Sequence, residues 1–122
     1  MKPDIRKACS QSEHFTSERL FIQEIWNCAD DELSIARARV KPGVTTSRHY
    51  LAGVHERYVV TVGRGRVEVG ALPATEVGPG DVVVIPADTA QRITNIGEGD
   101  LMFYCICTPR FEPSCYREVE DD

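Results

Sequence analysis

The sequence predicts a single all-β domain built as a barrel or a sandwich. Short β-prone segments recur along the chain, Gly and Pro residues separate them, and no helical period runs through the middle. The 122 residues also match the usual length of one domain. We therefore expect one domain over residues 1–122, with a core of strands at about 18–109.

Turn residues set the limits of the expected strands. The Pro-Gly dipeptide at 42–43 closes the second strand, because Pro cannot donate to a β-ladder and Gly tolerates turn geometry. The segment 63–65, Gly-Arg-Gly, is typical of a hairpin, and 79–81 marks another turn. Residues 1–14 and the chain after Pro109 leave room for a short helix. The expected strands cover residues 20–26, 33–40, 57–62, 66–69, 82–85, 93–96 and 101–108.

The composition is that of an ordinary water-soluble protein, with 42% hydrophobic and 27% charged residues. No apolar run approaches the ~20 residues of a membrane span, and no apolar segment follows the positive charges near the N-terminus. We therefore expect a cytoplasmic protein with no membrane contact. A net charge of −5 argues against broad attraction to nucleic acid. The acidic end at 118–122 is expected to be solvated.

Five cysteines are present, and an odd number without a signal peptide indicates free thiols in a reducing compartment. Cys105 and Cys107 are two apart on an expected strand, so their side chains share a face. One such pair does not make a four-sulfur zinc site, and Cys9, Cys28 and Cys115 have no matching partner. We expect the cysteines to act as small buried hydrophobes.

Residues 43–63 carry a distinctive spacing. Gly43 is followed after five residues by His49, Tyr50 and Leu51, then after four more by Glu56, and after six more by Gly63. This spacing resembles the first motif of the cupin family, G(X)5HXH(X)3-4E(X)6G. Leu51 stands where the family has its second histidine.

A second segment is similar to the other cupin motif, G(X)5PXG(X)2H(X)3N. It runs from Gly80 through Pro86 to Asn95, with Asp88 at the position of a turn Gly and Gln91 at the position of the last histidine. Several turn residues fall in register in both motifs at once. The resemblance therefore implies a cupin-like β-barrel, that is, a double-stranded β-helix or jelly roll of mostly antiparallel strands.

The resemblance also implies a metal site with a reduced ligand set. A cupin with three histidines and one carboxylate holds a divalent metal, whereas this chain offers His49, Glu56 and Gln91. An amide oxygen is a poorer ligand than an imidazole, so Zn, Mn, Ni or Fe would be held weakly or not at all. Leu51 makes one wall of the pocket apolar, which suits a small organic ligand.

Two residues beside this set are open to more than one interpretation. His55 precedes Glu56 and would complete an iron site only if the strand slipped by one residue, so we place it outward. Tyr58 shares the inward face with Glu56, where it is either a core tyrosine or an acid. The candidate catalytic residues are therefore Glu56 and Tyr58.

The sequence is compatible with three functions. The first is an enzyme of the isomerase or lyase type that performs redox-neutral chemistry on a small molecule, with an oxygenase as the variant if His55 binds iron. The second is a metal-free barrel that binds or senses a metabolite without catalysis. The third is a structural or assembly role. The resemblance to small cupins implies a dimer whose subunits exchange terminal strands, so a homodimer is expected in each case.

Overall fold

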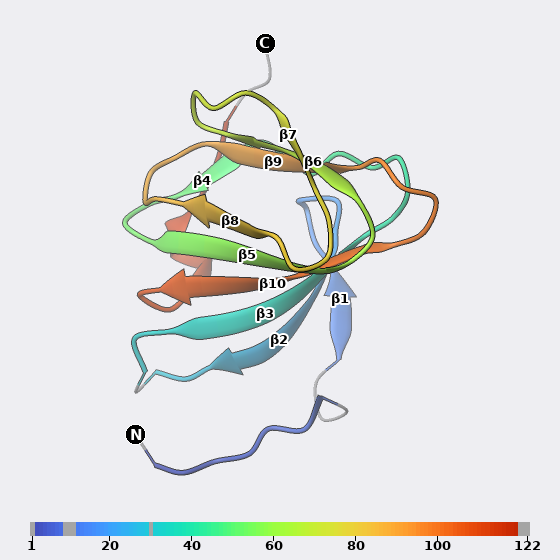
Figure 1. The fold of residues 1–122 in the computed structure, drawn as a ribbon. Coiled ribbons are helices and arrows are strands. Elements are labelled where there is room, and N and C mark those ends of the chain that lie inside the picture. Colours follow the sequence, from blue (N-terminus) through green and yellow to red (C-terminus); the bar gives the residue numbers. More distant parts are fainter. Residues whose placement is uncertain (1, 9–11, 30, 120–122) are drawn as a thin grey trace.

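A computed structural model describes residues 2–8, 12–29 and 31–119. In these ranges the chain forms eleven strands and one 3-10 turn, η2 (Pro113–Cys115) (Figure 1). No helix long and apolar enough to cross a membrane occurs in this part of the chain. The strands are β1 (Glu13–Phe15), β2 (Phe21–Asn27), β3 (Ser34–Val40), β4 (His49–Leu51), β5 (His55–Val62), β6 (Gly65–Val69), β7 (Thr75–Val77), β8 (Val82–Ile85), β9 (Gln91–Asn95), β10 (Leu101–Thr108) and β11 (Tyr116–Glu118).

The strands form two antiparallel sheets that face each other. One sheet has the order β1-β2-β3-β10-β5-β8 and the other β11-β4-β9-β6-β7. Hydrogen bonding between the described strands does not close the two sheets into one barrel. The predicted all-β, mostly antiparallel fold is confirmed in its two-sheet, jelly-roll form, with the core between the sheets (Figure 1).

Alternating burial along the strands explains how the core forms. In β10 every second residue is buried, from Leu101 to Cys107, and β9 alternates in the same way. Phe103 and Leu101 from one sheet meet Ile93 from the other, and all three are fully buried. Each such side chain contributes roughly 1.5–3 kcal/mol by leaving water. The period of two therefore determines which side chains face the pocket as well as the core.

All seven strands expected from the sequence are present; 82–85 and 101–108 match at both ends, and the other five have ends shifted by one or two residues. The four strands that the sequence did not indicate are β1, β4, β7 and β11, each three residues long. No α-helix forms in the described parts of the termini, where η2 is a single turn. A strand of three residues is too short to show a clear alternation, so it cannot be recognised from the sequence without knowing its pairing partner.

The predicted hairpin at 63–65 is wrong. β5 belongs to the first sheet and β6 to the second, so the Gly-Arg-Gly segment carries the chain from one sheet to the other. Gly63 has a φ of 88°, and a Cβ there would lie 2.6 Å from the backbone oxygen of Asp100. The glycine thus allows the chain to pack closely against the β9–β10 loop. In the sequence, a glycine needed for such packing cannot be distinguished from a glycine of a hairpin turn.

Two residues of the second motif, the substituted Asp88 and the retained Asn95, stabilise the backbone of neighbouring loops. Asp88, which replaces a turn glycine, has a φ of 65°, a conformation that Asp tolerates better than most residues. Its carboxylate accepts the backbone N–H of Gly53 at 3.0 Å. Asn95 is buried, and its amide donates to the backbone oxygens of Val40 and Gly99 at 2.8 Å. These two residues therefore hold the loops rather than a ligand.

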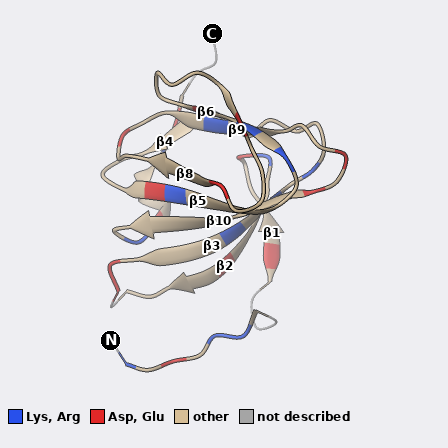
Figure 2. Cartoon of the chain, in the orientation of Figure 1, with Lys and Arg blue, Asp and Glu red and all other residues tan. Residues whose placement is uncertain are grey.

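Charged residues of both signs are interspersed along the strands and loops in the view of Figure 2. Arg39 on β3 illustrates the pattern, because its guanidinium pairs with Glu13 at 2.7 Å and with Asp100 at 3.2 Å. Such half-exposed pairs contribute little to stability individually.

Candidate functional site

A pocket of about 290 Å³ opens between the two sheets. Its walls come from the inward faces of β2, β3, β4, β5 and β10, and it is bordered by the β1–β2 loop and by the C-terminal segment around η2. The apolar part of the lining is larger than the polar part, and it includes Leu20, Ile22, Leu51, Phe103, Phe111 and Tyr116. A few polar groups converge in this mostly apolar space, as in small-molecule sites.

The structure brings the predicted site residues together. His49 on β4, Glu56 and Tyr58 on β5, and Leu51 all line the pocket and are buried. Gln91 on β9 is paired directly with His49 across the β4–β9 ladder and is also buried. Three separated segments of sequence therefore meet because their period-two faces point inward.

His55 lies outside this group, as the sequence predicted. It is exposed on the opposite face of β5 from Glu56, and its Nδ1 accepts the backbone N–H of Ala87 at 3.0 Å. The strand register is therefore the one that the motif implies. An iron site completed by His55, the basis of the oxygenase variant, does not agree with this geometry.

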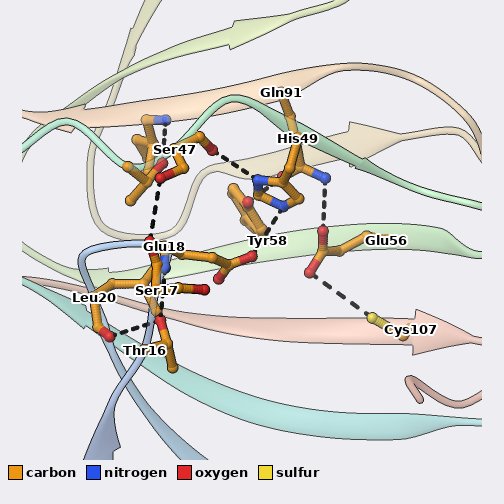
Figure 3. A network of polar contacts seen from close by, with 12 residues as sticks. Thr16, Ser17, Glu18, Leu20, Ser47, His49, Glu56, Tyr58, Gln91 and Cys107 are labelled. Atoms are coloured by element: carbon orange, nitrogen blue, oxygen red, sulfur yellow. Dashed lines mark hydrogen bonds and ion pairs between the residues drawn. The ribbon is translucent and has the colours of Figure 1, made fainter. Parts of the chain in front are cut away.

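A hydrogen-bonded chain links Tyr58, Gln91 and Glu56 (Figure 3). The Tyr58 hydroxyl donates to the Gln91 amide oxygen, and the Gln91 amide nitrogen donates to Glu56 Oε1 at 2.8 Å. Both ends of the amide are thus engaged. Gln91 is consequently a buried bridge between two titratable side chains, and Tyr58 does not point a free hydroxyl at the pocket.

A second polar pair joins His49 to Glu18, which the sequence analysis missed (Figure 3). His49 Nδ1 lies 2.8 Å from the backbone oxygen of Ser47, which can only accept, so Nδ1 carries a proton. His49 Nε2 lies 3.3 Å from Glu18 Oε1. At that distance a protonated Glu18 carboxyl can donate a hydrogen bond to Nε2.

The β1–β2 loop places Glu18 in the pocket. Thr16 closes this turn by bonding to Leu20 through both its backbone N–H, at 2.9 Å, and its hydroxyl, at 3.0 Å. The Ser47 N–H donates to the Glu18 backbone oxygen at 3.1 Å, which docks the turn onto the segment before His49. No periodic or motif signal marks Glu18 in the sequence, because a loop brings it there.

Burial shifts the acid–base properties of the pocket. It raises the pKa of Glu18 to about 7, with nearby Glu118 adding to the effect. Burial also raises the pKa of Glu56, against the opposing hydrogen bond from Gln91, and raises the pKa of Tyr58 well above its usual range. Two carboxyls with raised pKa values therefore lie in one pocket.

Glu18 should make the protein less stable as the pH rises. Its pKa in the folded protein, about 7, lies above the ordinary value of about 4.3 in an unfolded chain. Between these two pH values the unfolded chain loses the proton and the folded chain keeps it. The free energy of unfolding is therefore highest below about pH 4 and falls as the pH rises to about 7. We expect a loss of about 3 kcal/mol across this range.

Urea denaturation of the native chain and of Glu18→Gln at pH 4.5 and pH 8 measures this loss. The variant should be more stable relative to the native chain at pH 8 than at pH 4.5. Glu98→Gln removes one exposed carboxylate from the β9–β10 loop and serves as the control. Equal pH dependence in the native chain and Glu18→Gln contradicts the prediction.

The cysteines in the described parts of the chain are free, and Cys105, Cys107 and Cys115 are buried, as predicted. Cys9 lies outside the described residues. Cys105 and Cys107 share a face and line the pocket, and Cys107 Sγ lies 3.8 Å from Glu56 Oε2. Burial raises the pKa of Cys107, so it is present as a thiol beside the carboxyl.

The donor atoms do not fit a metal centre in their present arrangement. No group of three or more His, Cys, Asp or Glu side chains suited to a metal occurs in the described ranges. The oxygen that Gln91 would offer accepts the Tyr58 hydroxyl, and His49 Nε2 faces Glu18. The pocket is therefore best described by its acid–base groups.

Fold and site together define a class: a small two-sheet jelly roll whose polar side chains converge in a pocket between the sheets. The family model for the cupin domain matches residues 36–107, more than half of the chain. The chain belongs to the cupin family. No curated protein matches its sequence.

Solved structures of similar fold include several enzymes. Streptomyces Pac13, described as a unique nucleoside dehydratase, has a TM-score of 0.80 at 16% identity and covers 98% of this chain and 92% of its own. KdgF from Halomonas sp. has a TM-score of 0.81 at 15% identity, covering 93% and 99%. A predicted oxalate decarboxylase from Thermotoga maritima has 0.78 at 17%, covering 87% and 99%. At these identities the likeness shows the fold alone.

Proposed function

We propose that this protein binds a small organic ligand in the pocket and catalyses a redox-neutral proton transfer on it, of the isomerase or lyase type. The observation that carries the proposal is the His49–Glu18 pair, whose Nε2 and Oε1 atoms lie 3.3 Å apart in the lining of the pocket. An imidazole and a carboxyl side by side can give a proton to a bound molecule or take one from it.

Glu56 supplies the second acid–base group of the proposed reaction. Its carboxyl lines the same pocket, and the charge of Glu18 adds to the rise in its pKa. In an isomerisation, His49 removes a proton from a carbon next to a carbonyl, and a proton returns to a neighbouring atom. In an elimination, His49 takes the proton of the C–H bond, the C–O bond breaks as the double bond forms, and the departing hydroxyl takes the Glu56 proton and leaves as water. Neither reaction needs an oxidant.

Tyr58 has a positioning role in this proposal. Its hydroxyl holds the Gln91 amide, which in turn orients Glu56. Named relatives in fold give the reaction class some support, because Pac13 is described as a nucleoside dehydratase and structures of its variants contain uridine. A weakly bound divalent metal is the alternative source of carbonyl activation, and a metal-free binding barrel is the alternative without catalysis.

Proton exchange with solvent tests the proposal without knowledge of the natural substrate. The untagged protein is incubated in D2O with a panel of ketoses, aldoses and nucleosides, and 1H NMR follows loss of C–H signals and growth of alkene signals. We expect exchange or water loss for at least one compound, with the same rate after treatment with EDTA. Binding without exchange of any compound supports the binding barrel, and activity that EDTA abolishes supports the metal.

A further inference from the structure

The pocket lining is rich in carboxyl groups. The lining includes three carboxyl side chains, Glu18, Glu24 and Glu56, and no described Lys or Arg contributes to it. Glu24 lies on β2, is half-buried and takes no part in the network of Figure 3. Burial raises the pKa of each of these carboxyls, which shows that the pocket disfavours negative charge, and no described Lys or Arg of the lining would balance an anionic group that entered it.

Two arginines border a separate, more open groove beside the pocket. That groove shares Glu24 and Phe111 with the pocket and is bordered by Arg6 and Arg110. Arg6 pairs with Asp4 at 2.8 Å, and Arg110 pairs with Glu112 at 2.7 Å. Both guanidinium groups are thus already matched by carboxylates, which weakens their attraction for a phosphate or carboxylate of a ligand.

One polar atom at the pocket has no partner. The Tyr116 hydroxyl is buried and forms no hydrogen bond with any described residue, and its ring stacks on His49 with 4.9 Å between centroids. Tyr116 lines the pocket, so a ligand hydroxyl or carbonyl is a fitting partner for this atom. The partly exposed rings of Tyr116 and Phe111 offer apolar surface for a ring-shaped ligand.

We propose that the pocket selects uncharged, hydroxyl-bearing ring compounds, such as neutral sugars or nucleosides, and rejects their carboxylated and phosphorylated counterparts. The carboxyl oxygens accept hydrogen bonds from ligand hydroxyls, and Tyr116 bonds a further polar group. This inference rests on the pocket being the ligand site of the proposed function. It goes further by assigning the charge of the substrate.

Calorimetry on matched pairs tests the charge selection without any turnover. The pairs are uridine with uridine 5′-monophosphate, adenosine with adenosine 5′-monophosphate, and galactose with galacturonate. We expect the neutral member of a pair to bind at least about tenfold more tightly, since one uncompensated charge at close range is worth that much. Glu24→Gln should reduce the ratio of the two binding affinities several-fold, and Glu98→Gln, at an exposed position, should leave this ratio unchanged.

Tyr116→Phe separates a ligand contact from a structural role. It should weaken binding of the neutral compound several-fold while leaving the melting temperature unchanged or higher, because it removes a buried hydroxyl without a partner. Tighter binding of a monophosphate or of galacturonate overturns the proposal, and so does absence of binding by every neutral compound. Selective binding without proton exchange in D2O keeps this inference and removes the catalytic one.

Discussion

Replacing His49 by Gln is expected to slow the proposed reaction by about 10²–10⁴-fold, the usual contribution of a general acid–base group. His49 Nε2 faces Glu18 at 3.3 Å and is the only ring nitrogen of His49 free to exchange a proton, because Nδ1 donates to Ser47. A Gln amide can still donate to the Ser47 oxygen and preserve the local structure. It cannot take or release a proton near neutral pH.

The rate of C–H exchange in D2O, measured on the compound that the native protein turns over, checks this prediction. His55→Gln is the matched control, because His55 is exposed on the opposite face of β5 and should keep the native rate. Circular dichroism and the melting temperature establish that both variants are folded. A His49→Gln variant with the native rate would remove His49 from the reaction and leave Glu56 as the base.

Replacing Gln91 by Leu is expected to lower the free energy of unfolding by about 4 kcal/mol, since two buried polar groups each lose a partner at about 1–3 kcal/mol. The Tyr58 hydroxyl loses its acceptor and Glu56 Oε1 loses its donor, although Leu leaves little cavity. Gln91 is only 1% exposed, so water does not replace these bonds readily. The buried amide therefore acts as a structural link between Tyr58 and Glu56.

Urea denaturation of Gln91→Leu, Tyr58→Phe and the double variant measures the link. The double variant has no Tyr58 hydroxyl that could be left without a partner. Its loss of unfolding free energy should therefore be smaller than the sum of the losses in the two single variants. The native chain should keep its stability in EDTA, whereas a metal held by Gln91 would make EDTA destabilising. A Gln91→Leu variant within about 1 kcal/mol of the native chain contradicts this account.

The sequence contained enough information for most of the fold. A period of two marked the longer strands, and the spacing of glycines and prolines marked the turns at Gly43 and Gly80, both of which have positive φ. The same periodicity correctly placed His49, Glu56 and Gln91 on inward faces and His55 on the outer face. Local backbone geometry produces these signals, so they can be seen without knowing which strands pair.

Long-range pairing decided the rest. The sheet to which β6 belongs, and hence the failure of the expected hairpin after β5, depends on the pairing of β6 with β7 and β9. The same holds for the site. Glu18 reaches His49 because its loop docks on Ser47, which lies 29 residues further along the chain. Tyr116 reaches His49 because β11 pairs with β4.

The sequence by itself determined a jelly-roll scaffold and the inward set of His49, Glu56 and Gln91, because periodicity and turn chemistry are local properties. Only the tertiary structure decided what those side chains do. It joined Gln91 to Tyr58 and Glu56, and it set Glu18 beside His49 in a buried pocket. Hydrogen-bond partners and the burial that raises the pKa of Glu18 depend on segments far apart in the chain, which no local pattern records.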